Sequence, residues 1–500
     1  MYVRLHERAA VTALAVIAVA ASALFLSNTQ ATAAPRDPLG NEGRWIIDTQ
    51  GRVVVLHGVN MVTKHPPYFA KGLGFGRDDA EFLRSHGFNT VRLGVIYTAV
   101  EPQPGRYDDR YLDQIAREAR LLARHGIHVL LDFHQDMYNG AFQGGGFPDW
   151  AVKDDGLPRE PKAGFPLNYW LMPALQHAYD NFWANSPGPG GVGLQDRFAA
   201  AWRHVAKRLG KLKRLVGYDI MNEPSPGSSI NECSTWTGCP GFDRGPLSSF
   251  NERVYRAIRK ADRRHLVWHE PHGGFGFGNP SFTEGTGGKR SGFSFHLYCI
   301  GIPGFAGGES RPCERVNADI FGDAEAASRR TGDALLLTEF GANVRWPDSV
   351  AEAVTLADEF MIGWQHWAYT TDTHVPGSGP PGPGGILVDD ARKPLRGANV
   401  AHETLQLLVR PYPQAVAGTP RRWEFDPATH RFELVYKTRP VGDELRARAR
   451  TEVVVPRLQY PDGYRADVEG GRITSPKNAR LLKIAAARHA KTVKLKLAPR

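Results

Sequence analysis

This sequence is poor in cysteine and, after its first 26 residues, has no long hydrophobic run. Its four cysteines include no CxxC pattern, and no histidine pair stands near them at metal-ligand spacing. A zinc site is therefore not indicated, and neither is another metal or a cofactor. Because no later segment is apolar enough to span a bilayer, we expect the mature chain to be soluble. The sequence also has no internal repeat and no long disordered linker.

The four cysteines fall into two local pairs. Cys233 and Cys239 bracket a short loop around Trp236, and Cys299 and Cys313 bracket a Gly/Pro-rich loop. Disulfides are common in exported proteins. Of the three connectivities that four cysteines allow, we expect the local one, which pairs Cys233 with Cys239 and Cys299 with Cys313.

The one long hydrophobic run, Ala9–Leu26, stands at the N-terminus behind Arg4 and Arg8. The small residues Ala31–Ala33 follow it, as at a signal-peptide cleavage site. We therefore expect residues 1–33 to be a secretory signal, cleaved near Ala33, and the protein to be secreted. The alternative is a retained membrane anchor, because the run approaches the length that spans a bilayer.

The length of the chain and the distribution of its charge both indicate two domains after the predicted signal. A chain of 500 residues is too long for one ordinary domain, and a barrel followed by a smaller module is the simplest division. We expect a barrel domain at 34–407 and a module at 408–500, where the pattern changes. The module holds 20 Lys and Arg against 9 Asp and Glu, which leaves 42 against 43 elsewhere.

The basic charge of the module favours a peripheral contact with an anionic membrane surface or with acidic glycans. The alternative is a solvated basic face that only aids solubility. We expect a monomer without a nucleic-acid partner.

Eight short hydrophobic runs recur with helical patterns between them, which is typical of βα units and a parallel sheet. The first continues the second arm of a predicted hairpin, Trp45–Asp48 and Val53–Leu56. The expected strands are 53–60, 90–93, 127–133, 215–222, 266–270, 293–298, 334–338 and 363–367. Eight such units close a (β/α)₈ barrel, so the expected fold class is α/β with a TIM barrel.

Beyond Leu408 the pattern becomes that of antiparallel strands. Arg431–Lys437, Thr451–Val455 and Thr492–Leu497 include period-two alternation, and turn signals such as Pro461–Gly463 separate them. Half-buried strands of this kind predict a small C-terminal antiparallel β-sandwich.

Two glutamates stand directly after buried-strand patterns, 116 residues apart. Glu223 follows Leu215–Asn222, and Glu339 follows Ala334–Thr338. Barrel enzymes carry their catalytic groups at the carboxyl ends of the strands. Two carboxylates held there can cleave a glycosidic bond. Glu270, after the fifth strand, is a third candidate that this reasoning does not exclude.

These motifs resemble those of glycoside hydrolase family 5, a retaining (β/α)₈ family. The matching residues, in the family's order, are Gly58–Asn60, Arg92, His134–Gln135, Asn222–Pro224, His296–Tyr298, Thr338–Gly341 and Trp367. The resemblance covers about Trp45 to Leu408. Further likeness to bacterial endoglycoceramidases and endogalactosylceramidases, which release an intact oligosaccharide from ceramide, lies in Lys64, His134–Tyr138, Asp180–Trp183 and the appended β module.

The resemblance implies that Glu223 is the acid/base and Glu339 the nucleophile. Arg92 and Tyr298 would hold Glu339 ionised and oriented. Asn222 would bind the sugar 2-hydroxyl, and Trp367 would form an apolar floor. The full implied set of substrate-binding residues is Lys64, Arg92, His134, Asp136, Asn222, Tyr298 and Trp367. From the residues alone, Arg92 could instead belong to a core ion pair, Tyr298 could be a buried hydroxyl, and His134 could be structural.

A loop of roughly sixty residues after the third strand, and the loops Gly273–Pro280 and Pro376–Gly385, leave the same face of the predicted barrel. The longest loop is rich in large apolar residues, namely Met137, Tyr138, Phe142, Trp150, Phe165, Tyr169, Trp170, Leu171 and Met172. They form either a minicore under the loop or an apolar groove for a lipid aglycone.

The sequence thus predicts a retaining endo-glycosidase that cleaves glycosphingolipids between oligosaccharide and ceramide. One alternative is a family 5 β-glucanase or a simple glycosyl-lipid β-glucosidase. Another is a non-catalytic protein that binds glycan or lipid, because fold does not fix function. The aromatic loop favours the glycosphingolipid, but the sequence does not distinguish glucose from galactose as the first sugar.

Overall fold

The computed structural model describes residues 35–298, 312–341, 348–370 and 385–500. The predicted signal at 1–33, Cys299 and most of the loop at 376–385 lie outside the described residues, so these predictions stay predictions. Within the described ranges, no helix combines the length and the apolar character needed to cross a membrane.

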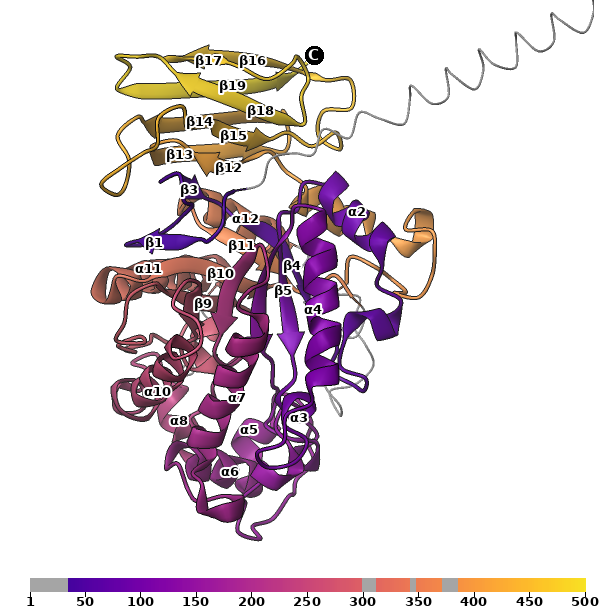
Figure 1. Cartoon of the computed structure of the whole chain (residues 1–500), viewed down its shortest axis with the longest axis vertical. Coiled ribbons are helices and arrows are strands. Elements are labelled where there is room, and N and C mark those ends of the chain that lie inside the picture. Colours follow the sequence, from indigo (N-terminus) through magenta and orange to yellow (C-terminus); the bar gives the residue numbers. More distant parts are fainter. Residues whose placement is uncertain (1–34, 299–311, 342–347, 371–384) are drawn as a thin grey trace, which may run out of the picture. The chain divides into compact units, whose positions relative to one another are not determined.

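Eight parallel strands close into a barrel in the order β10-β11-β4-β5-β6-β7-β8-β9 (Figure 1). They are β4 (His57–Met61), β5 (Thr90–Val95), β6 (His128–Phe133), β7 (Leu215–Asp219), β8 (Leu266–His269), β9 (Ser291–Leu297), β10 (Ala334–Phe340) and β11 (Gly363–His366). Every residue in them is buried. Burial on both faces explains why the sequence showed continuous hydrophobic runs, and the predicted barrel is confirmed.

Helices alternate with these strands and cover the barrel (Figure 1). They include α2 (Arg77–Ser85), α4 (Asp109–Arg124), α7 (Leu194–Leu209), α10 (Ser248–Arg259), α11 (Cys313–Thr331), α12 (Asp348–Glu359) and α13 (His402–Leu408). The helix α4 shows how the sequence determines where a helix begins and which of its faces is buried. The Asp108 carboxylate accepts hydrogen bonds from two backbone N–H groups of its first turn, and Leu112, Ile115 and Leu122 bury its apolar face.

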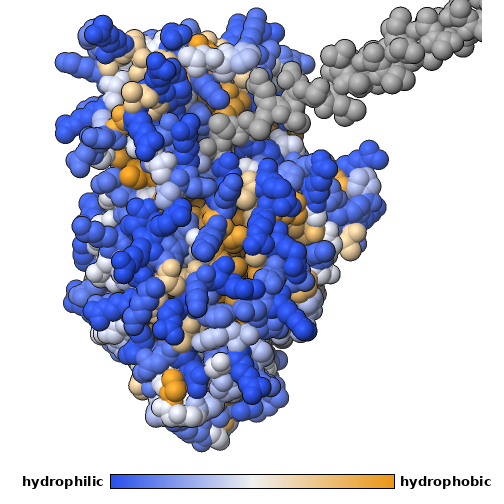
Figure 2. Space-filling view, in the orientation of Figure 1, coloured by the Kyte–Doolittle hydropathy of each residue, from blue (hydrophilic) through white to orange (hydrophobic). Residues whose placement is uncertain are grey.

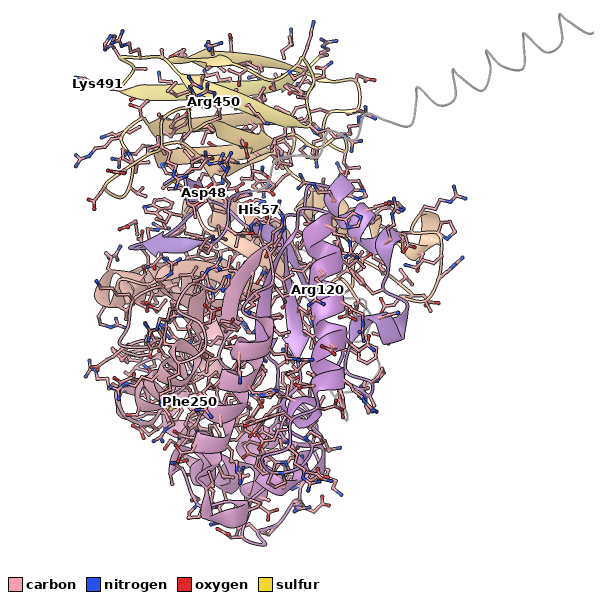
Figure 3. The ribbon with its side chains drawn as sticks, in the orientation of Figure 1. Asp48, His57, Arg120, Phe250, Arg450 and Lys491 are labelled. Carbon is pink, nitrogen blue, oxygen red and sulfur yellow. A yellow bond between two sulfur atoms is a disulfide. The ribbon has the colours of Figure 1, made fainter. Side chains whose placement is uncertain are left out.

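The long loop after β6 contains α5 (Asn168–Leu171), α6 (Pro173–Trp183) and three short 3₁₀ segments, which are Gly140–Phe142, Asp149–Ala151 and Pro189–Gly191. Most of its aromatic residues form a minicore. The ring of Phe147 lies 4.0 Å from Tyr138 and 5.3 Å from Phe182, and Phe182 contacts Phe250, which Figure 3 labels. Met137, Tyr138, Phe142 and Met172 are fully buried here, so these four do not line a groove.

The C-terminal strands form two antiparallel sheets, as the predicted sandwich requires. One has the order β13-β14-β19-β16, and the other has the order β1-β2-β3-β12-β15-β18-β17. Their bounds are β1 (Gly40–Glu42), β2 (Trp45–Ile47), β3 (Val53–Val54), β12 (Tyr412–Val416), β13 (Thr419–Asp426), β14 (Arg431–Lys437), β15 (Thr451–Val454), β16 (Tyr464–Glu469), β17 (Gly471–Ile473), β18 (Leu481–Ala486) and β19 (Thr492–Pro499). The sequence did not predict that β1–β3 extend the second sheet.

The C-terminal strands contact the barrel where the barrel strands begin. Val54 of β3 pairs with Ala415 of β12, and three residues later His57, labelled in Figure 3, opens β4. The imidazole of His57 stacks on Tyr412 at 3.8 Å and on Trp364 at 4.3 Å. Contacts of this kind join Ala34–Arg500 into one compact unit. The boundary at residue 408 stays a prediction.

The outer face of the four-stranded sheet carries charges of both signs. Lys494 pairs with Glu469 at 3.3 Å and Lys496 with Glu433 at 3.6 Å, while Arg422 also reaches Glu433 at 2.7 Å. Hydrophilic residues cover most of the face seen in Figure 2. Some of the basic side chains of the module are therefore paired with acids on this sheet.

Candidate active site

Glu223 and Glu339 meet at the carboxyl end of the barrel. Glu223 lies four residues beyond the end of β7, with a left-handed backbone φ of 42°, and Glu339 lies within β10 next to a register shift. One oxygen of each carboxylate and a ring nitrogen of His296 all lie within 4.8 Å of one another. Retaining glycosidases hold their two carboxyl groups about 5–5.5 Å apart, whereas inverting enzymes need about 6.5–9.5 Å.

Both oxygens of Glu339 accept hydrogen bonds. Arg92 donates from Nη1 to Oε1 at 2.7 Å, and the Tyr298 hydroxyl donates to Oε2 at 3.0 Å. These two donors orient the carboxylate and stabilise its negative charge. The structure therefore brings Arg92, Tyr298 and Glu339 together as the sequence predicted.

Arg92 is the buried centre of a carboxylate cluster. Its guanidinium contacts Asp219 at 3.0 Å, Asp132 at 3.0 Å and Glu270 at 2.7 Å, besides Glu339. Burial by itself would lower the pKa of Arg92, but the four carboxylates raise it well above its usual value. A buried cation at this point is therefore stabilised by all four acids.

Glu223 has the environment of a proton donor. Its side chain is 16% exposed, and its Oε1 lies 2.8 Å from Nδ1 of His296. Burial raises the pKa of Glu223, the negative charges of Glu339 and Glu270 raise it further, and His296 opposes them; the net direction is upward. Two neighbouring carboxylates with different surroundings can thus hold different protonation states.

His296 links the acidic groups, and sequence reasoning gave it no role. Besides Glu223, its Nδ1 lies 3.6 Å from Glu339, and its Nε2 lies 3.4 Å from Glu270. Burial lowers the pKa of His296, but Glu270 and Glu339 raise it well above the usual value. The sequence pattern that could have revealed this role is the position of His296 in β9, two residues before Tyr298. Alternate residues of a strand point to the same face, so His296 and Tyr298 are expected on the same side.

Glu270, the third candidate carboxylate, is engaged on both oxygens. Oε1 accepts from Arg92 at 2.7 Å, and Oε2 accepts from the backbone N–H of Glu223 at 2.8 Å. Burial raises the pKa of Glu270, but His296, Arg92 and that backbone N–H together lower it. Glu270 is therefore suited to position Glu223 rather than to donate a proton.

Asn222 is also held from both ends. Its Oδ1 accepts from Arg92 at 3.1 Å, and its Nδ2 donates to the carbonyl of Gln135 at 3.0 Å. The amide of Gln135 in turn donates to the carbonyl of Asn222 at 2.8 Å. Sequence reasoning gave Gln135 no separate role, although it stands in the His134–Gln135 motif.

A polar group lies beside the carboxylate pair. His134 stacks on Trp367 with ring centroids 5.2 Å apart, and Lys64 lies over the same indole at 4.6 Å. Lys64 also pairs with Asp136 at 2.7 Å. Burial raises the pKa of Asp136, but Lys64 and His134 lower it far more. The structure thus brings the predicted residues Lys64, His134, Asp136 and Trp367 together.

An apolar pocket that is partly open to solvent lies next to Glu223. Its lining residues are Phe165, Pro166, Tyr169, Trp170, Glu223, Ser225, Pro226, Ile230, Cys233, Ser234, His272, Gly273, Gly274 and Phe277. The predicted disulfide between Cys233 and Cys239 is present and anchors one wall. The aromatic loop therefore forms both structures considered from the sequence, a minicore and, through Phe165, Tyr169 and Trp170, an apolar pocket.

Three groups of side chains among the described residues have ligand atoms close enough for a metal ion. In the first, Cys239 is bonded to Cys233 and has no thiolate to offer. In the other two, Arg92 and His296 place positive charge against the acids. Their donor sets do not fit a metal.

The barrel matches the family model "Cellulase (glycosyl hydrolase family 5)" over residues 48–373. The C-terminal strands match "Glycoside hydrolase family 5 C-terminal domain" over residues 410–497. Together these models cover most of the chain.

Known relatives match over nearly the full length. Endoglycoceramidase I from Rhodococcus hoagii is 34% identical, over 91% of this chain and 87% of its own. A solved structure of endo-glycoceramidase II from a Rhodococcus species, described as its lactosyl-enzyme intermediate, aligns with a TM-score of 0.72 and 29% identity over 91% of this chain and 99% of that one. A complex of that enzyme with ganglioside GM3 aligns with a TM-score of 0.71 and 28% identity, over 91% and 98% of the two chains.

The barrel and its paired carboxylates define a retaining glycoside hydrolase. The chain belongs to glycoside hydrolase family 5 and, within it, to the group of the endoglycoceramidases.

Proposed function

We propose that this protein hydrolyses the β-glycosidic bond between the oligosaccharide and the ceramide of glycosphingolipids. Glu223 is the acid/base and Glu339 the nucleophile. The observation that carries this proposal is an apolar pocket that Glu223 lines next to a carboxylate pair whose nearest oxygens lie within 4.8 Å of each other.

In the first step, a Glu339 oxygen attacks the anomeric carbon, and the bond from that carbon to the aglycone oxygen breaks. Glu223 donates its proton to the departing oxygen, which leaves as the primary hydroxyl of ceramide. Arg92 and Tyr298 hold the nucleophile by its two oxygens. The product of this step is a glycosyl ester of Glu339.

In the second step, Glu223 acts as a base for water. The negative charge of Glu339 is one of the causes that raise the pKa of Glu223, and the ester no longer carries this charge. The pKa of Glu223 therefore falls in the intermediate, which suits removal of a proton from water. Water then attacks the anomeric carbon, Glu339 leaves, and the β configuration is restored.

The position of the pocket identifies the aglycone side. An acid that protonates the leaving-group oxygen must lie between the sugar and the aglycone. On the sugar side, the polar group of Lys64, His134, Asp136 and Trp367 offers donors, acceptors and an apolar ring face. On the other side, Glu223 borders Phe165, Trp170 and Phe277. A wall of this kind favours a lipid over a further sugar.

The comparisons support the same substrate class. Endoglycoceramidase I is the 34% identical relative, and the endo-glycoceramidase II structures include one with ganglioside GM3. Secretion through the signal at 1–33, a monomeric state and a membrane contact through the basic module stay predictions alongside this function.

A substrate panel tests the proposal. We would compare kcat/KM on lactosylceramide, galactosylceramide, a ganglioside and a soluble cello-oligosaccharide, and identify the products by mass spectrometry. We expect equimolar ceramide and intact oligosaccharide, with the cello-oligosaccharide turned over poorly. Equal rates on the cello-oligosaccharide would favour a β-glucanase, and stepwise release of single sugars would favour a simple β-glucosidase; either result would overturn the proposal.

A further inference from the structure

Three large apolar side chains that are exposed stand next to pocket-lining residues in the sequence. In the described part of the chain, Leu167 is 44% exposed, Leu171 48% and Trp236 68%. Each is a close sequence neighbour of a lining residue: Leu167 follows Pro166, Leu171 follows Trp170, and Trp236 lies two residues after Ser234. We call these three residues the apolar rim.

The segments that carry the rim are joined to each other. The indole of Trp170 donates to the Ser234 hydroxyl at 3.0 Å, which ties α5 to the loop that carries Trp236. The backbone N–H of Leu171 donates to the carbonyl of Leu167 at 3.0 Å, so these two leucines lie one turn apart on the same face.

The loop of Trp236 is short and held at both ends. The disulfide between Cys233 and Cys239 closes it, and the hydroxyls of Thr235 and Thr237 are hydrogen-bonded at 2.8 Å. An indole held at the tip of such a loop does not fold back into the core. Tryptophan prefers the interface between membrane and water, and moving a large apolar side chain out of water is favourable.

We propose that the apolar rim of Leu167, Leu171 and Trp236 inserts into the headgroup region of a phospholipid bilayer. The mouth of the pocket then opens onto the membrane, and the lipid part of the substrate passes from bilayer to pocket without crossing water. This proposal rests on the proposed function, because it concerns how that substrate reaches that pocket.

The fold favours the rim over the basic module as the membrane contact during catalysis. The C-terminal strands contact the barrel at His57, where β4 begins, and at Gly87, just before β5. The carboxylates and the pocket lie at the ends where strands leave the barrel. A bilayer bound by the module would therefore lie at the end of the barrel opposite the pocket that Glu223 lines.

The test uses the full chain with the rim variant L167N/L171N/W236S. The matched control is L458N, because Leu458 is 39% exposed in the C-terminal module. A module variant, R488Q/K491Q, represents the rival contact. The probe is a vesicle of uncharged phosphatidylcholine without glycolipid, and binding is measured by co-sedimentation and by quenching of tryptophan fluorescence with brominated phosphatidylcholine.

We expect the rim variant to lose vesicle binding by roughly 10-fold or more, since three apolar side chains are removed, and L458N and R488Q/K491Q to bind as the wild type does. Quenching by brominated lipid should disappear in the rim variant and in the single variant W236S, and should persist in L458N and R488Q/K491Q. On glycolipid in vesicles, kcat/KM should fall to a similar extent in the rim variant. Hydrolysis of a soluble aryl lactoside should be unchanged.

Vesicle binding that survives in the rim variant, or that fails in R488Q/K491Q, would overturn the proposal. Light scattering that shows a dimer in the wild type and a monomer in the rim variant, without vesicle binding, would assign the rim to a second copy of the chain instead. If no variant hydrolyses the aryl lactoside or any glycolipid, the proposed function fails, while the vesicle measurements still decide the role of the rim.

Discussion

Among the residues of the site, the three glutamates differ through their neighbours rather than their burial. Glu339 has a guanidinium and a phenol on its two oxygens. Glu270 has a guanidinium and a backbone N–H. Only Glu223 faces two negative neighbours with a single histidine as partner. This difference separates the acid from the nucleophile, and it assigns Glu270 a positioning role that the sequence left open.

Replacing either catalytic carboxylate should abolish most of the activity. We expect E223Q and E339Q each to lower kcat by several orders of magnitude, because each removes one of two obligatory roles. Both variants should keep the melting temperature of the wild type within a few degrees, because each change is isosteric. Turnover of lactosylceramide and thermal unfolding by circular dichroism are the measurements.

Azide distinguishes the two roles. In E223A azide should attack the Glu339 glycosyl ester at the β face and restore cleavage of an activated aryl lactoside, with a β-glycosyl azide as the product. In E339A any azide product should be the α-anomer, because azide then displaces the aryl group directly in place of Glu339. An α-glycosyl azide from the Glu223 variant, or a β-glycosyl azide from the Glu339 variant, would reverse the assignment.

Replacing Glu270 should change the pH dependence of the reaction. Its negative charge is one of the causes that raise the pKa of Glu223. In E270Q that pKa should fall, so the basic limb of the kcat/KM profile should move to lower pH, and azide should not restore the rate. A profile with an unmoved basic limb, or rescue of E270Q by azide, would mean that Glu270 does not act through Glu223.

At the scale of secondary-structure elements, the local sequence pattern predicted the strands that are buried on both faces. The eight barrel strands were predictable because their runs are continuously apolar. The pairing of β3 with β12 could not be predicted from the sequence. Val54 and Ala415 are more than three hundred positions apart, and neither strand contains a pattern that identifies the other as its partner. The second arm of the predicted hairpin also divides, since Val53–Val54 joins one sheet and His57–Met61 another.

The site was predictable where a motif placed a residue at a strand exit. Glu223, Glu339, Arg92 and Tyr298 lie together as expected. His296 and Asp219 were missed because their role depends on neighbours from other strands, and Trp170 could not be separated from Tyr138 because both belong to one aromatic loop. Packing against the barrel, rather than composition, decides that Tyr138 is in the minicore and Trp170 in the pocket.

The helix α4 contains a buried acid with a testable effect on stability. Glu118 accepts a hydrogen bond from the backbone N–H of Lys71 at 2.7 Å. Burial raises its pKa from 4.5 to about 7, against the opposing backbone hydrogen bonds. The folded state therefore holds its proton more tightly than the unfolded state, and the stability that it contributes is lost as pH rises from about 4.5 to about 7.

We expect the free energy of unfolding of the wild type to fall relative to that of E118Q by on the order of 3 kcal/mol between about pH 4 and about pH 8. Urea unfolding of both proteins at the two pH values measures the difference, in which other titrating groups cancel. A constant difference, or one that changes in the opposite direction, would show that the pKa of Glu118 is not raised in the folded state.

For the molecule as a whole, the two ends of the barrel have different tasks. The C-terminal strands cover the ends where the barrel strands begin, through His57, Tyr412 and the hydrogen bond from Tyr412 to Gly87. The other ends hold the carboxylates, the polar sugar side and the apolar pocket. The module therefore supports the barrel and leaves its catalytic end free to meet a lipid surface.

The most direct test of the account is a proton NMR time course of ganglioside hydrolysis. We expect the first product to be the intact oligosaccharide with its new reducing end in the β configuration, because Glu339 and then water each invert the anomeric carbon. The α-anomer should appear later, by mutarotation. An oligosaccharide that first appears as the α-anomer, or a free monosaccharide in its place, would contradict the account.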